Sequence, residues 1–220
     1  MVKFSSDVDI LKYEPILFGE LHLSSQVLAA GTGGTVSGTS FTASGADFVN
    51  AKVEAGQVIY LQSAEGSLDG AYEIVSVDSA TELTVSVVRA DCEDEPIAPP
   101  EATDVSYRIS TFEMQSGEVG LQLTEYFGIR PGDPASDYDV EDVLDASVLK
   151  SASVFGVIAI VYAMLASSVV DKDENFWKKS LHYRRLFERA LERCRLSIDD
   201  DGDGVADITR PGATFRLMRD

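Results

Sequence analysis

The feature that most constrains this chain is the apolar run from Val154 to Ala166, which contains no charged side chain. A membrane span needs about 20 apolar residues. The run reaches that length only by including four flanking serines, Ser151, Ser153, Ser167 and Ser168. A helix that is apolar on all sides is more often buried among other elements. We therefore expect an interior helix here, with a membrane span as the alternative.

The residues that follow the run predict a long amphipathic helix over 174–196. Its apolar side chains lie close to one stripe, namely Phe176, Trp177, Tyr183, Phe187, Ala190, Leu191 and Cys194. Arg185, Arg189 and Arg193 recur four residues apart on another side. Glutamates one turn away can pair with such arginines and stabilise the helix slightly. This basic row is therefore either a solvated, salt-bridged face or a docking face for an acidic protein surface.

The middle of the chain predicts short antiparallel strands over residues 56–110. Four segments alternate or concentrate β-forming residues, namely 57–62, 71–77, 83–87 and 105–111. Asp69-Gly70 is a hairpin-turn signal. Strands at this spacing indicate a small barrel or sandwich. The Gly- and Thr-rich residues 31–46 predict a flexible strand or loop, because glycine disfavours helix.

The flanking segments predict helices. Residues 7–30 follow helical spacing in part, and a short helix from Gln115 is expected to end at Gly128. The acidic residues 137–142 suit the N-terminus of a further helix, which we expect to continue into the apolar run.

The predicted fold class is therefore α+β: a helical bundle of about four helices with an inserted small antiparallel β-barrel or sandwich domain. The expected divisions are 1–30 and 113–198 for the helical core, 31–112 for the β domain, and 199–220 for an Asp-rich turn and a C-terminal arm. A β domain of only about 80 residues should have a marginal core of its own. We expect neighbouring subunits to support it.

Charge is distributed unevenly along the chain. The sequence has 18 Lys and Arg against 37 Asp and Glu, a formal net charge of −19. Residues 1–150 hold 7 basic and 26 acidic side chains, whereas 151–220 hold 11 of each. Such asymmetry suggests two surfaces with different neighbours, or a solvated acidic domain adapted to high salt. The negative charge argues against unaided binding to nucleic acid or anionic lipid.

One motif has the spacing of metal ligands. Asp199, Asp201, Asp203 and Asp207 occupy positions 1, 3, 5 and 9 of a loop whose sixth residue is Gly204. Calcium takes six to eight hard oxygens from alternate residues of such loops. Position 12, where a bidentate carboxylate is needed, is Arg210. The motif is therefore either a low-affinity Ca²⁺ site or a turn whose carboxylates accept backbone N–H bonds.

Nothing in the sequence nominates a catalytic site. GxSxG, HExxH, CxxC and P-loop patterns are absent, and neither His22 nor His182 lies in a motif. Two cysteines, Cys92 and Cys194, are too few for a disulfide scaffold. Because no catalytic motif is present, we expect no enzymatic activity. The polar residues after Met1 do not resemble a secretory signal, so we expect assembly in the cytosol.

The order of parts resembles the head–tail connector (adaptor) proteins of tailed bacteriophages. Three segments carry the resemblance: the β module within 48–88, the apolar helix followed by the amphipathic 177–194 helix, and the C-terminal sequence from Ser197 to Asp220. Another neck or tail component, such as a head-closure or tail-completion protein, fits the same order of parts. A calcium-dependent binding module is an alternative from a different class.

The resemblance implies a structural virion protein of the neck region, assembled in the host cytoplasm. Connectors form homo-oligomeric rings, usually dodecamers, between the portal protein and the next tail or neck protein. DNA would pass through the channel without specific binding, and no membrane is involved. The C-terminal arm would dock on the portal through Phe215, Arg216, Leu217, Met218 and Arg219.

Overall fold

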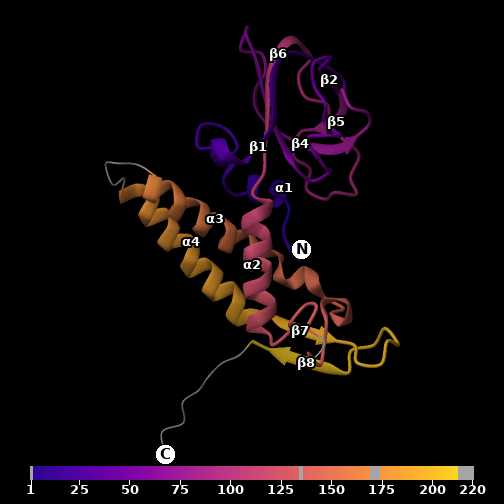
Figure 1. Cartoon of the computed structure of the whole chain (residues 1–220), viewed down its shortest axis with the longest axis vertical. Coiled ribbons are helices and arrows are strands. Elements are labelled where there is room, and N and C mark those ends of the chain that lie inside the picture. The colour runs from indigo at the N-terminus through magenta and orange to yellow at the C-terminus, as the bar shows by residue number, and fades with distance from the viewer. Residues whose placement is uncertain (1, 134–135, 169–173, 213–220) are drawn as a thin grey trace, which may run out of the picture. The chain divides into compact units, whose positions relative to one another are not determined.

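The computed structural model describes residues 2–133, 136–168 and 174–212. The chain divides into two compact units (Figure 1). We call Ser6–Phe112 the barrel unit, and Met1–Ser5 together with Glu113–Asp220 the helical unit.

The barrel unit is a closed antiparallel barrel with strand order β1-β2-β5-β4-β3-β6 (Figure 1). Its strands are β1 Val27–Ser37, β2 Ser40–Thr42, β3 Val58–Ser63, β4 Asp69–Val77, β5 Glu82–Ser86 and β6 Ala102–Ser110. Before β1 come the short helix α1 (Asp7–Leu11) and two 3₁₀ turns, Pro15–Leu17 and Ser24–Gln26. Closure of the barrel leaves no sheet edge for another strand to extend.

The barrel encloses its own apolar core. Alternate residues of its strands point inward and are fully buried, among them Ile59, Leu61, Ile74, Leu83, Val85 and Ile109. The rings of Phe41, Phe48 and Tyr107 meet at the centre, with centroids 5.3 to 6.2 Å apart. Each large apolar side chain buried in this way contributes roughly 1.5–3 kcal/mol. The barrel unit therefore encloses a contiguous apolar core formed by its own residues.

Two glycines explain why β1 belongs to the barrel. A Cβ atom at Gly31 would lie 2.8 Å from the ring of Tyr107, and one at Gly34 would lie 2.6 Å from the ring of Phe41. The absent side chains let these rings pack against the strand. Because β1 places glycines rather than apolar side chains toward the core, its sequence lacks the alternation of apolar and polar residues that identifies a strand.

The helical unit contains α2 (Glu113–Tyr126), α3 (Lys150–Ser168) and α4 (Glu174–Arg193), followed by the hairpin of β7 (Arg195–Ile198) and β8 (Ile208–Pro211). Helices α3 and α4 pack side by side (Figure 1). The rings of Tyr162 and Tyr183 stack between them at 6.2 Å, and Ser180 Oγ donates to the Ala159 carbonyl at 2.9 Å. Gly156 permits close approach, since a Cβ there would lie 2.9 Å from Val119 of α2.

The predicted fold class is wrong in how it ranks the two parts. The molecule is a closed six-stranded barrel together with helices, not a helical bundle with a small inserted domain. The barrel unit spans Ser6–Phe112, so the segment expected to add helix at the N-terminus mostly serves the barrel. The error arose because the Gly- and Thr-rich β1 carries no apolar alternation.

Two local predictions are wrong, and a third is confirmed. Asp69 and Gly70 do not form the hairpin turn but lie in β4, paired with Gln62 and Leu61 of β3. The acidic residues 137–142 end in a 3₁₀ turn, Val140–Asp142, and the long helix begins only at Lys150. The prediction that Gly128 ends a helix is confirmed: α2 stops at Tyr126, and Gly128 has a φ of +72°.

Candidate functional site

The predicted basic row lies on the exposed side of α4. Arg185, Arg189 and Arg193 are all exposed, and none forms an ion pair with another residue that the structure describes. The neighbouring Arg184 differs, because its Nε lies 3.4 Å from Glu188 Oε1. The row is therefore solvated, as one interpretation predicted, but within the described residues it is not salt-bridged. It presents three guanidinium groups to solvent.

An apolar groove lies between the three helices. Its volume is about 350 Å³, and its lining comes from α2, α3 and α4: Gln122, Gly156, Ala159, Ile160, Ala163, Trp177, Ser180, Leu181, Arg184, Phe187 and Glu188. Trp177 is 53% exposed and Leu181 37% exposed. Trp177 thus leaves the buried stripe in which its spacing placed it, whereas Tyr183, Leu191 and Cys194 are buried as expected.

Helix α3 is only partly covered by the other residues that the structure describes. Ala146–Ser167 is long and apolar enough to cross a membrane, and 56% of its most apolar 18-residue window is buried. The core helix of a soluble protein meets the same criteria of length and composition. Val157, Ile158 and Val161 are buried, whereas Met164 is 36% exposed. The uncovered side adjoins the groove through Ile160 and Ala163.

The Asp-rich loop joins β7 to β8 and is organised by one carboxylate. Asp199 is only 8% exposed, and it accepts backbone N–H bonds from Gly202 and Gly204 at 2.7 Å and from Asp203 at 3.3 Å. These bonds, led by that from Gly204, lower the pKa of Asp199. Asp207 accepts a bond from the Asp200 N–H at 2.9 Å. The loop is therefore a turn whose carboxylates accept backbone N–H bonds, which is one of the two interpretations of the motif.

The same loop brings three carboxylates together. Asp199, Asp201 and Asp207 each offer an oxygen, and these oxygens lie within 4.8 Å of one another. Asp203 is not in this group; its Oδ1 accepts the Val205 N–H at 2.7 Å. Arg210, at position 12, turns away and donates to the Phe127 carbonyl at 3.1 Å. Three of the four predicted ligands could thus hold a hard cation, without the bidentate twelfth ligand.

The predicted docking arm lies outside the described residues. Phe215, Arg216, Leu217, Met218 and Arg219 belong to that part of the chain. The structure describes the chain to Gly212, just after β8.

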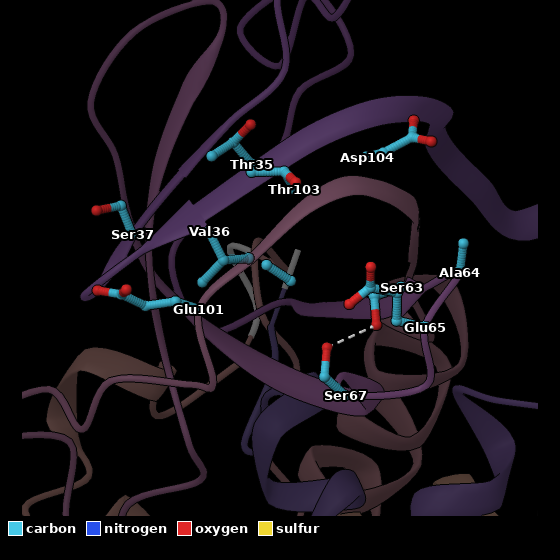
Figure 2. A pocket seen from close by; sticks show the side chains of 11 residues that line it. Thr35, Val36, Ser37, Ser63, Ala64, Glu65, Ser67, Glu101, Thr103 and Asp104 are labelled. Carbon is cyan, nitrogen blue, oxygen red and sulfur yellow. Dashed lines mark hydrogen bonds between the residues drawn. The ribbon is translucent and has the colours of Figure 1, made fainter.

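A pocket that no sequence pattern predicts lies at one end of the barrel, and we call it the mouth pocket. Its volume is about 530 Å³. Figure 2 shows its lining, which comes from the end of β1, the β3–β4 turn and the start of β6: Thr35, Val36, Ser37, Ser63, Ala64, Glu65, Ser67, Glu101, Ala102, Thr103 and Asp104. These side chains are small hydroxyls, carboxylates and short apolar groups, and none of them is basic.

Backbone irregularities shape this mouth. The register of β1 against β6 shifts on both sides of the pair Gly34–Val105. Gly33 has a φ of +74° on one strand and Asp104 has a φ of +54° on the other. Bulges of this kind bend strand ends and redirect side chains. Of these two irregularities, only the one at Gly33 could be predicted from the sequence, because it lies in a glycine-rich segment.

The thiols and imidazoles do not converge on a site. Cys92 is exposed and Cys194 is buried, and burial raises the pKa of the Cys194 thiol. His22 Nδ1 contacts the Gly19 carbonyl at 3.0 Å, while His182 packs edge-on against Tyr183. Within the described residues, this arrangement suggests no nucleophile–base pair.

Comparisons with protein-family models, with curated proteins and with solved structures find no significant match to this chain. The resemblance to connector proteins therefore remains an inference from the order and character of the segments.

Proposed function

We propose that this chain is a structural protein of a tailed-phage virion, a head–tail adaptor. In this proposal it forms a homo-oligomeric ring, dodecameric by analogy, between the portal and the next tail or neck protein. It acts by assembly rather than by turnover. It is made in the host cytoplasm and resides in the neck of the particle.

The observation that carries the proposal is the incomplete covering of α3. Buried apolar surface contributes about 25 cal/mol per Å², so an apolar helix left open on one side favours a partner. The groove beside α3 adds exposed Trp177 and Leu181. Contiguous apolar surface of this sort marks interaction sites on soluble proteins. A neighbouring subunit that covers the groove would complete the core of the helical unit.

Charge supports the same proposal. The barrel unit contains 4 basic and 17 acidic side chains, so its surface is strongly negative. If this surface lines a channel, it repels DNA phosphates and keeps the genome from adhering as it passes. The basic row on α4 supplies the opposite sign for contacts with acidic protein surfaces.

A cryo-electron-microscopy reconstruction of the particle's neck tests the proposal. We expect this chain in a closed ring between the portal and the tail, with the α2–α4 groove covered by the adjacent subunit. Finding the chain elsewhere in the neck or tail would favour a head-closure or tail-completion role. Its absence from the particle would overturn the proposal.

A second candidate function is a calcium-dependent binding module. One observation favours it, the acidic triad of Asp199, Asp201 and Asp207. Calorimetric titration with Ca²⁺ would test it, with the Asp199→Ala, Asp201→Ala, Asp207→Ala variant as the control. Saturable heat in the native chain that is lost in the variant would support this function. A titration without saturable heat would exclude a calcium-dependent binding module.

A further inference from the structure

The chemistry of the mouth pocket selects for a cation. Three carboxylates line it, Glu65, Glu101 and Asp104, and none forms a side-chain hydrogen bond or ion pair with another residue that the structure describes. Five hydroxyls line it as well, those of Thr35, Ser37, Ser63, Ser67 and Thr103, and the last two serines in chain order, Ser63 and Ser67, bond each other at 3.0 Å. Because no basic side chain is present, an anion would be repelled, whereas a group rich in N–H donors would find acceptors on several sides (Figure 2).

The pocket does not suit a single metal ion. Within the described residues, acidic oxygens converge to within 4.8 Å only at Asp199, Asp201 and Asp207, not at the barrel mouth. The mouth carboxylates are instead spread around about 530 Å³. A cation that uses them together must be extended and carry several donors. Guanidinium groups meet this requirement, since each presents five N–H donors and keeps its charge at all ordinary pH values.

The chain itself carries guanidinium groups of this kind. Arg185, Arg189 and Arg193 extend from one side of α4, exposed and without an ion-pair partner among the described residues. A spacing of four residues advances about 6 Å along a helix, so neighbouring arginines can enter one site or flank its rim. The helix bearing them belongs to the less acidic part of a chain whose net charge is −19.

We propose that the mouth pocket of one copy of this chain receives the arginine row of a second copy. The occupant is fixed by charge complementarity, because the arginine row and the pocket carboxylates are opposite in sign, and neither set is ion-paired within the part of the chain that the structure describes. The contact joins two different surfaces, and such heterologous contacts build rings when the rotation closes. The inference rests on the proposed ring and specifies one of its subunit contacts.

Two charge-reversed variants test the contact. The row variant carries Arg185→Glu, Arg189→Glu and Arg193→Glu, and the mouth variant carries Glu65→Lys and Glu101→Lys. All five positions are exposed, so we expect both variants to fold, as checked by circular dichroism and thermal melting. Asp104 is left unchanged because its positive φ makes substitution costly. Matched controls are Lys178→Glu, an exposed position on the same helix outside the groove lining, and Glu93→Lys with Glu95→Lys on the barrel unit.

Sedimentation velocity measures the outcome. We expect the native chain and both controls to associate, and each variant alone to weaken self-association at least tenfold. An equimolar mixture of the two variants should then regain association, because the native row of one variant meets the native mouth of the other, and the reversed row and reversed mouth are again opposite in sign. The mixture retains one native row and one native mouth, on different chains. Only a heterologous contact gives this result.

Other outcomes overturn the inference in distinguishable ways. If both variants associate like the native chain, the contact is wrong but the proposed ring stands. If the mixture stays monomeric while the native chain associates, the row and the mouth do not face each other. If putrescine binds the mouth but reversing the row changes nothing, the pocket takes a free amine instead. A native chain that is monomeric at every concentration contradicts both the contact and the ring.

Discussion

The two units bury their apolar side chains to very different extents. In the barrel unit, the inward rows close on one another, so that Phe41, Ile59 and Leu83 are completely buried. In the helical unit, Leu121, Trp177 and Leu181 remain exposed beside a helix that is almost wholly apolar. The difference teaches that the two units close their cores to different degrees. The barrel unit encloses its apolar rows, and the helical unit leaves large apolar side chains exposed to solvent.

The largest expected effect concerns the barrel core. Phe41→Ala removes a ring that packs on both Phe48 and Tyr107, and it should lower the free energy of unfolding by about 3–5 kcal/mol. Urea denaturation of the native and variant chains measures this loss. The control Val49→Ala, at a residue that is 58% exposed, should change little. Equal effects at the two positions would contradict a self-sufficient barrel core.

The next effect concerns the buried ion pair of the barrel unit. Glu73 accepts from Arg89 Nη2 at 2.6 Å and from Nε at 3.2 Å, and both side chains are nearly inaccessible. Glu73→Ala should cost about 3 kcal/mol, because it leaves a guanidinium buried without its counter-charge. Adding Arg89→Met should recover part of this loss in the same denaturation assay. A double variant no more stable than the single one would show that the pair is not the cause.

A smaller effect on stability should accompany a large effect on assembly at the groove. Trp177→Ser with Leu181→Ser removes exposed apolar groups, so unfolding should change by less than about 1 kcal/mol. The same variant should no longer form the native oligomer in size-exclusion chromatography with light scattering. Val87→Ser, at a 39% exposed barrel residue, is the matched control. Retained assembly would show that the groove is not an interface.

The smallest effect concerns acid pH. Backbone N–H bonds lower the pKa of Asp199 in the folded chain, so its carboxylate adds stability that is present above the unfolded pKa of about 3.9. That contribution is lost as the pH falls through the lower folded pKa. Asp199→Asn should therefore melt a few degrees below the native chain near pH 6, and the gap should shrink below about pH 4. A gap independent of pH would rule out this origin.

The sequence predicted local structure best where side-chain pattern alone determines it. The apolar run became α3 and the amphipathic segment became α4 because helical spacing is visible in the residues themselves. It failed at β1, where Gly31 makes room for the ring of Tyr107, which lies far along the sequence on β6, and Gly34 makes room for the ring of Phe41 on β2. Misjudging that strand turned a closed barrel into a minor insertion.

The candidate site divides in the same way. The Asp-rich turn was readable, since its bonds join residues at most seven positions apart. The exposure of Trp177 could not be predicted from the sequence. Helical spacing places Trp177 on the apolar stripe, but the packing of α3 leaves its side chain exposed to solvent. The mouth pocket was also hidden, because its lining comes from three separate strand ends.

The most direct test of the account is the assembly state of the full chain, measured by native mass spectrometry with and without the portal protein. The account predicts a multi-subunit species of defined stoichiometry, either alone or once the portal is added. A chain that remains a monomer under both conditions would contradict it, since the open side of α3 would then need no partner.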